Sequence, residues 1–303
     1  MSPHFALLSS AVLALQTAGF LVQVVPHVIT NLDGYSEGIV FDAGGDGYVS
    51  ALHRDAVYRL HGNEPPAVWF RAKQPNGHKI LADGSHLIAA RGGIYRVGHD
   101  ARLIKIVGQQ IATPNDLALD GDGGVYISGP AELPKDQQAG RSKVYYLDSS
   151  GAVRQVADGF RFPNGLIVRA DGRALLVSDT DTRRIYELQI TAPGTVTTRR
   201  VFSELADKKA GPDGMTFDQE GHLYIADYGT GDVVVLNAGG GLLRRYATGL
   251  RHPSNVAFGG RELGELFVTG SPNEEEGPGQ VVMLPLGVRG RSSLAMPASL
   301  ARR

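Results

Sequence analysis

Six side chains that carry oxygen stand at similar places along the chain, each directly before an apolar run. They are Glu37, Asn76, Asn115, Asn164, Asp213 and Asn255. Hard cations such as calcium prefer several carboxylate and amide oxygens in one flexible shell. Neither His nor Cys occupies any of the six places, so zinc or copper fits less naturally. The pattern predicts a site for a divalent cation, provided that the fold brings these side chains together.

A simpler interpretation of the same residues is local. Asn and Asp beside Gly or Pro often accept hydrogen bonds from their own backbone and so form turns. For a single residue of this kind the turn is the better interpretation. Glu37, however, is a poor turn former, and six copies share one phase. The whole set therefore favours a cation site.

The elements that must position these residues form an internal repeat. Each copy contains a Gly or Asn turn, an apolar strand, a polar hairpin and a second apolar strand, and the copies start at Glu37, Asn76, Pro114, Pro163, Pro212 and Pro253. Asp46-Gly47, Asp83-Gly84 and Asp171-Gly172 are typical hairpin turns. A third apolar stretch follows each of the first five hairpins, for example at residues 56–60, 93–97, 143–147, 184–188 and 232–236. Fourth stretches follow at 103–107, 153–157 and 242–247.

Units of four strands with a period of about 40 to 50 residues are typical of propeller blades. We therefore predict an all-β fold, a six-bladed β-propeller with four antiparallel strands in each blade. The starts of the innermost strands line the central channel of such a fold. The predicted metal site accordingly lies in that channel.

Composition limits the partners and the chemistry. The 303 residues carry a net charge of -1, with 42% hydrophobic and 20% charged residues. Since nucleic acids and anionic membranes require concentrated positive charge, a neutral small molecule is the expected partner. The chain contains 40 Gly, which suits many tight turns, and no Cys, which excludes disulfides and thiolate chemistry.

One domain accounts for most of the chain. We expect a single propeller over residues 26–290 and a tail over residues 291–303, with no membrane span and a monomer or small homo-oligomer. For residues 1–25 two interpretations stay open, a signal peptide or an outer strand in the segment from Phe20 to Ile29. No Lys or Arg precedes the apolar run, which favours a cytoplasmic over a periplasmic or secreted protein. The polar segment 129–142 is a solvated loop or a lid over the channel.

Five motifs give the chain a family resemblance. They are SEGIVFD from Ser36, TPNDLALD from Thr113, FPNGLIV from Phe162, GPDGMTFD from Gly211, and PSNVAFGG with LFVTG between Pro253 and Gly270. In this order and spacing the chain resembles the senescence marker protein and gluconolactonase family of six-bladed propellers. The resemblance implies metal ligation by Glu37, Asn164 and Asp213, and places Asn115 beside the ion or its bound water.

The activity that the resemblance implies is metal-dependent hydrolysis of a small lactone. Calcium is the expected ion, with zinc, manganese and magnesium as alternatives. We expect Asp213 to be the general base, with Asp116 as the second candidate; a turn role explains Asp116 equally well. The family also includes phosphotriester hydrolases. Relatives that hydrolyse gluconolactone commonly carry an Arg before the PND-type Asn, whereas this chain has Thr113 and Pro114, which disfavours a polyhydroxylated aldonolactone.

Four residues are candidates for substrate contact, namely Asn115, His78, Asn255 and Asp179. His78 follows Asn76-Gly77 and is a candidate proton shuttle, although a solvated loop histidine explains it as well; the same holds for His252. Asp179 resembles a family aspartate near the channel, but capping of a turn is an equal alternative.

Two other classes of protein compete with the lactonase. One is a non-catalytic propeller that binds a protein partner. The other is a propeller related to strictosidine synthase or to lyases, which uses side-chain acid and base chemistry. The oxygen ligands Glu37 and Asp213 on the axis count against the binding module. Metal dependence separates the strictosidine-synthase-like propeller from the lactonase, because its side-chain chemistry is expected to survive chelation.

Overall fold

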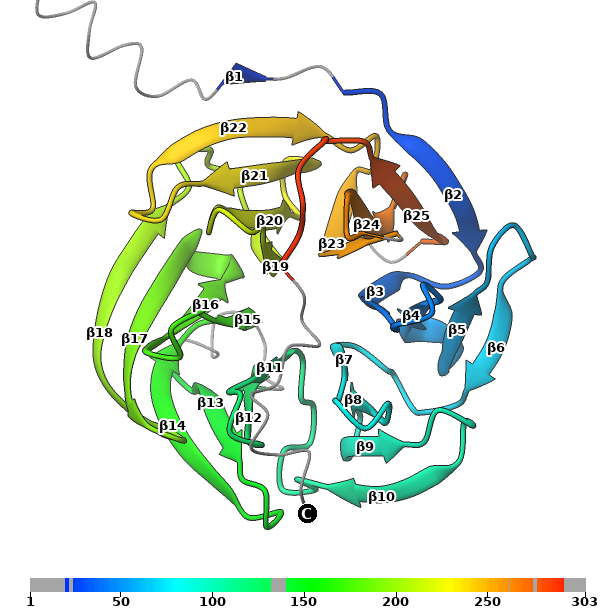
Figure 1. Cartoon of the computed structure of the whole chain (residues 1–303). Coiled ribbons are helices and arrows are strands. Elements are labelled where there is room, and N and C mark those ends of the chain that lie inside the picture. The colour runs from blue at the N-terminus through cyan, green and yellow to red at the C-terminus, as the bar shows by residue number, and fades with distance from the viewer. Residues whose placement is uncertain (1–19, 22–23, 132–139, 261, 275–276, 292–303) are drawn as a thin grey trace, which may run out of the picture.

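The computed structural model describes residues 20–21, 24–131, 140–260, 262–274 and 277–291. Six small antiparallel sheets surround a common axis, and strands β3, β7, β11, β15, β19 and β23 lie nearest to it (Figure 1). This arrangement is a six-bladed β-propeller, so the predicted fold class is confirmed.

The four strands of each sheet follow the predicted repeat. Sheet one contains β3 (Ser36–Phe41), β4 (Gly47–Ala51), β5 (Ala56–Leu60) and β6 (Ala67–Phe70), and sheet two contains β7 (His78–Ile80), β8 (His86–Ala90), β9 (Gly93–Val97) and β10 (Leu103–Val107). Sheet three contains β11 (Leu117–Leu119), β12 (Val125–Gly129), β13 (Ser142–Leu147) and β14 (Val153–Phe160), and sheet four contains β15 (Pro163–Val168), β16 (Ala174–Asp179), β17 (Arg184–Ala192) and β18 (Thr195–Glu204). Sheet five contains β19 (Pro212–Phe217), β20 (Leu223–Asp227), β21 (Asp232–Leu236) and β22 (Leu242–Ala247). Within the described residues, the short 3₁₀ turns Leu52–Arg54 and Thr180–Thr182 connect strands.

The sixth sheet joins the two ends of the domain. It contains β23 (His252–Gly259), β24 (Glu265–Ser271) and β25 (Gly279–Leu284), and its outer strand is β2 (His27–Leu32) from the start of the domain. Strand β2 pairs antiparallel with β25, and β23 contacts β3 of sheet one. This pairing closes the ring, because the last sheet is completed by a strand that precedes the first.

Each innermost strand packs against both neighbouring sheets. Leu166 of β15 lies in a cluster with Tyr126 and Val144 of sheet three, whereas the next residue, Ile167, packs against a cluster with residues of sheet five such as Leu223. Successive side chains of a strand point to opposite faces. Apolar residues on both faces of β15 are therefore covered, and burial of these residues stabilises the ring.

The ends of the chain lie largely outside the described residues. Of the segment 1–25, strand β1 (Phe20–Leu21) pairs in parallel with β22. Residues 1–19, 22–23, 132–139 and 292–303 fall outside the description, and with them the predicted signal peptide, most of the loop 129–142 and the tail. Among the described residues, no helix has the length and apolar character required to cross a membrane.

Candidate metal centre

The residues at the starts of the six innermost strands form a closed circle, which we call the axial ring. Three of the contacts join backbones: Gly38 approaches Asn76 O, Gly77 N–H donates to Asn115 O (2.8 Å), and Gly165 approaches Asp213 O. Asp116 accepts a hydrogen bond from Leu166 N–H, Gly214 lies against Asn255, and Ser254 Oγ donates to Ser36 O (2.6 Å). The fold therefore brings the predicted site residues of all six units to the axis.

Each of the three predicted ligands lies within a β-bulge. The pairing register shifts between Ser36 and Ile39, between Pro163 and Leu166, and between Pro212 and Met215. These intervals contain Glu37, Asn164 and Asp213. A bulge leaves the extra residue unpaired and turns its side chain, a device that is frequent beside active sites.

Glycine follows most of the ring residues for a steric reason. A Cβ on Gly165 would lie 2.2 Å from Asp213 O, and one on Gly38 would lie 2.5 Å from Asn76 O. Real Cβ atoms do not approach backbone oxygens so closely, so the strand starts can converge only where the side chain is absent. The Asn-Gly, Asp-Gly and Glu-Gly pairs of the repeat are thus packing requirements.

The predicted ligands are buried and make few hydrogen bonds. Glu37, Asn164 and Asp213 are 9%, 6% and 5% exposed. Asn164 Nδ2 donates to Thr180 Oγ1 (3.2 Å), so its Oδ1 is the atom that a cation would use. The oxygen atoms of three blades therefore converge in a site with little solvent.

Crowding of negative charge raises the proton affinity of the ring. Burial, and next to it the Asp116 carboxylate, raises the pKa of Glu37 from 4.5 to about 8. Burial together with Glu37 and Asp116 raises the pKa of Asp213 well above its usual range. Burial and the charges of Glu37 and Asp213 also raise the pKa of Tyr35. Mutual repulsion of this kind is relieved by a bound cation.

The donor set fits a hard divalent cation. Asn115 Oδ1 is buried and has no hydrogen-bond partner, although buried polar atoms normally have one. In the part of the chain that the structure describes, no three His, Cys, Asp or Glu side chains are arranged to hold an ion by themselves. The candidate set mixes two carboxylates, Glu37 and Asp213, with the amides Asn115 and Asn164, which is oxygen chemistry of the kind that calcium prefers.

Asp116, the second candidate for the base, is held by donors on both sides. It is 2% exposed, its Oδ2 accepts a hydrogen bond from Leu166 N–H (3.1 Å), and its Oδ1 lies 3.4 Å from Lys79 Nζ. Sequence reasoning missed Lys79. The signal was present, because Lys79 is a charged residue at a position where the other units have Val40, Ala118, Ile167, Thr216 and Ala257.

The structure places His78 away from the axis. Its ring is completely buried, its Nε2 lies 2.9 Å from His86 Nδ1, and it contacts Tyr48 and Trp69 of sheet one. His78 occupies the strand position that holds Ile39, Leu117, Leu166, Met215 and Val256 elsewhere in the repeat. The histidine thus replaces an apolar residue between sheets one and two.

Asn255 lies one position beyond its predicted place. Strand pairing aligns Val256 with Met215 and Pro253 with Pro212, so Ser254 is the equivalent of Asp213. Asn255 Oδ1 accepts a hydrogen bond from Val256 N–H (3.0 Å), and its amide group fills the space above Gly214. Because Asn255 replaces the glycine of the repeat, its side chain packs within the ring.

Asp179 and His252 lie near the same end of the strands. Asp179 accepts hydrogen bonds from Phe162 N–H (2.9 Å) and Arg161 N–H (3.0 Å), which is the geometry of a turn cap. The His252 ring packs at a tilt against that of Tyr228, with 4.8 Å between ring centroids, and the His252 backbone carbonyl accepts a hydrogen bond from Tyr35 (3.2 Å). Tyr35, which sequence reasoning missed, connects this rim to the carboxylates of the ring.

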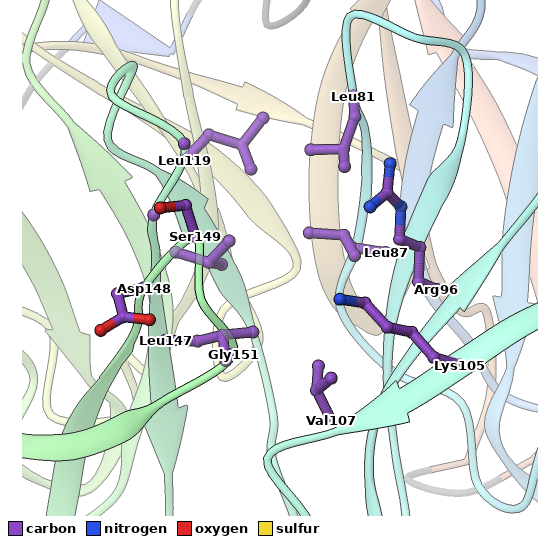
Figure 2. Close-up of a pocket in the computed structure, with 13 residues that line it drawn as sticks. Leu81, Leu87, Arg96, Lys105, Val107, Leu119, Leu147, Asp148, Ser149 and Gly151 are labelled. Carbon is purple, nitrogen blue, oxygen red and sulfur yellow. The ribbon is translucent and has the colours of Figure 1, made fainter. Parts of the chain in front are cut away.

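Two cavities lie outside the ring. One of about 240 Å³ is lined by Thr113, Arg141, Lys143 and Tyr145, among others, and Thr113 precedes the ring residue Asn115 by two positions. The other, of about 80 Å³, lies between sheets two and three (Figure 2). Leu81 and Leu87 face Leu119 and Leu147 across it, and no residue of the axial ring lines it. The second cavity is therefore separate from the candidate centre.

Comparison with known proteins agrees with this architecture. The model of the SMP-30/gluconolactonase/LRE-like region matches residues 35–271, and the chain belongs to this family. It is similar to the diisopropyl-fluorophosphatase of Loligo vulgaris, with 27% identity over 256 residues, 74% of this chain and 82% of the relative. It is also similar to a pentonolactonase of Haloferax volcanii, with 32% identity over 205 residues, 66% and 68% of the two chains.

Solved structures share the fold over nearly the whole chain. A calcium-binding regucalcin of Agrobacterium tumefaciens superposes with a TM-score of 0.80 at 20% identity, covering 92% of this chain and all of that one. A gluconolactonase of Xanthomonas campestris superposes with a TM-score of 0.74 at 25% identity, covering 91% and 93%. The family resemblance of the five motifs is thereby confirmed.

Proposed function

We propose that the protein is a metal-dependent lactonase whose ion, calcium in the first instance, is held by Glu37, Asn164 and Asp213 with Asn115 beside it. The observation that carries the proposal is the convergence of buried carboxylates and an unpartnered amide oxygen at the axis. The pentonolactonase and gluconolactonase among the relatives, and the calcium-binding regucalcin among the structures of the same fold, support the same conclusion.

The chemistry divides between the ion and the side chains. A bound divalent ion supplies Lewis-acid polarisation of the lactone carbonyl and increases the acidity of water. Asp213 accepts the proton of the attacking water as a new bond forms from the water oxygen to the carbonyl carbon. The ring C–O bond then breaks, the proton passes to the leaving alkoxide, and the product is a hydroxy acid.

Asp213 suits the role of general base better than Asp116. Both oxygens of the Asp116 carboxylate are already engaged, Oδ2 by Leu166 N–H and Oδ1 by Lys79 Nζ. Burial and the neighbouring carboxylates raise the pKa of Asp213 well above its usual range, so its carboxylate has a high affinity for a proton. Asp116 is therefore a residue that orients the ring.

Thr113 directs the choice of substrate. It stands where relatives that hydrolyse gluconolactone commonly carry an arginine, and it borders the cavity of about 240 Å³. We infer a lactone with fewer hydroxyl groups than an aldonolactone. Hydrolysis of a phosphotriester is the second candidate, since diisopropyl-fluorophosphatase is one of the relatives.

The test is hydrolysis of a panel of aliphatic lactones, sugar lactones and one phosphotriester, before and after chelation. Calcium, zinc, manganese and magnesium are then added back singly. The proposal predicts lactone turnover that chelation abolishes and calcium restores, with aliphatic lactones ahead of sugar lactones. Turnover that survives chelation would contradict it and favour a lyase-like propeller, and binding of an ion without turnover would leave a binding module.

A further inference from the structure

Two departures from the repeat at the axial ring contact each other, and Asp116 is the first of this pair. The residue after the ring position is Gly38, Gly77, Gly165 or Gly214 in four units, but Asp116 in the third. A Cβ on Gly77 would lie 2.6 Å from both Asp116 Cα and Asp116 Oδ1. The carboxylate therefore stands at a point where two strand starts touch, and the neighbouring glycine leaves room for it.

Lys79 is the second departure. Two positions further along the strand the repeat has Val40, Ala118, Ile167, Thr216 and Ala257, all uncharged, and only the second unit has a lysine. Because strand residues alternate between faces, this position points to the next sheet. The Lys79 ammonium lies 3.4 Å from Asp116 Oδ1, and the two side chains are 21% and 3% exposed. The two residues that depart from the repeat, Asp116 and Lys79, are thus in contact with each other.

The pair lies within electrostatic range of the candidate ligands. The Asp116 charge acts on both Glu37 and Asp213. Asp116 thus adds a third negative charge to those of Glu37 and Asp213, and the Lys79 ammonium, 3.4 Å from Asp116 Oδ1, offsets that added charge. In a buried site such charges interact several times more strongly than in water. Two negative charges balance one divalent ion.

We propose that Lys79 acts through Asp116 as the counter-charge that matches the axial centre to a divalent rather than a trivalent cation. The inference rests on the proposed function, because it assumes that the ring binds a metal. Without Lys79 the centre would hold three negative charges. It would then favour an ion of higher charge, and lanthanides share with calcium the preference for oxygen ligands.

The experiment measures ion preference by binding alone. Calcium affinity is determined by titration calorimetry and terbium affinity by luminescence, in the whole metal-free chain at low ionic strength. Lys79→Met is expected to shift the preference toward terbium by about tenfold. Lys79→Arg, which keeps the charge, is expected to retain the wild-type preference. Lys105→Met removes an exposed lysine outside the ring and is the matched control.

A double variant separates charge from structure. Asp116→Asn alone is expected to weaken calcium binding by about tenfold, because it leaves one negative charge. Lys79→Met with Asp116→Asn returns the centre to two negative charges, and its ion preference is expected within about threefold of wild type. A purely structural role of Lys79 would lower stability in both variants and move neither preference.

Each result is decisive. An unchanged preference in Lys79→Met, or a double variant that fails to restore it, overturns the counter-charge role while calcium binding by the wild type preserves the proposed function. Failure of the wild type to bind either ion overturns the proposed function as well.

Discussion

The innermost strands carry acidic residues at both ends, and the two ends differ in what surrounds them. At the hairpin end, Asp42 Oδ1 accepts hydrogen bonds from Gly44 N–H (2.9 Å) and Asp46 N–H (3.0 Å), and Oδ2 accepts one from Tyr48 (3.2 Å). Asp120 and Asp218 follow the same plan, with two local donors and a tyrosine. At the axial end the acidic residues are buried beside one another.

The contrast shows how one residue type serves two purposes. Backbone N–H groups and a tyrosine satisfy the hairpin carboxylates, so these side chains stabilise turns. At the axial end, burial raises the pKa of Glu37 and that of Asp213, and the like charges that face each other raise both further. Groups with perturbed pKa values cluster at functional sites, and this supports the proposal that the ion binds at the axial end.

The largest expected effect comes from breaking the axial end. Asp213→Asn removes both a candidate ligand and the candidate base, so lactone hydrolysis is expected to fall by about 10²- to 10⁴-fold. The metal-free variant is expected to be at least as stable as wild type, because a repelled carboxylate has gone. Steady-state kinetics and urea unfolding measure the two effects; activity within tenfold of wild type would exclude Asp213 from the reaction.

The pH dependence of stability gives the next effect. The folded-state pKa of Glu37, about 8, exceeds its ordinary value of 4.5, so the folded state binds the proton more tightly. This stabilisation is fully present below pH 4.5 and is lost as pH rises through about 8. The metal-free protein is therefore expected to lose a few kcal/mol between pH 5 and pH 9.

Chemical unfolding across this pH range checks the prediction. Calcium is expected to remove the slope, and Glu37→Gln is expected to flatten it without calcium. A metal-free protein whose stability rises with pH would show that the axial carboxylates do not repel one another.

A third effect concerns the packing that lets the axial ends converge. Gly165→Ala places a Cβ 2.2 Å from Asp213 O, and the required shift is expected to cost about 1 to 3 kcal/mol and to weaken calcium binding. Gly264→Ala is the control, because nothing lies within 4 Å of its Cβ, and it is expected to change stability by less than about 1 kcal/mol. Equal stability of the two variants in urea would refute the packing role of the axial glycine.

The smallest effect is expected at the hairpin end. Asp42→Asn keeps an acceptor for the two backbone N–H groups but loses the charge, so it is expected to cost about 1 kcal/mol. Hydrolysis is expected to stay within about twofold of wild type. Thermal unfolding and kinetics of the same preparation test both statements, and a large loss of activity would mean that the two ends are coupled.

Much of this architecture was predictable because the repeat is regular. Strands at 56–60, 93–97, 103–107, 232–236 and 242–247 have the predicted bounds. The convergence of Glu37, Asn115, Asn164 and Asp213 followed from the phase of the repeat. These features depend on local turns and on periodic apolar residues, which a single sequence displays.

The remaining features depend on contacts between sheets. Ser254 and Asn255 are both polar, so only strand pairing shows which of them matches Asp213. The buried position of His78 was predictable, because apolar residues occupy its place in the other units. A histidine directly after Asn-Gly nevertheless suggests a loop. Lys79 and Asp116 belong to different units of the repeat. To predict their contact, one must know which face of each strand meets the neighbouring sheet.

Calcium titration of the metal-free chain tests the central claim most directly, with Asp213→Asn and Asp42→Asn measured beside wild type. The account predicts one calcium ion per chain in the wild type and in Asp42→Asn, and no saturable binding in Asp213→Asn. Calcium binding that survives in Asp213→Asn, or its absence from the wild type, would contradict a metal centre at the axial end.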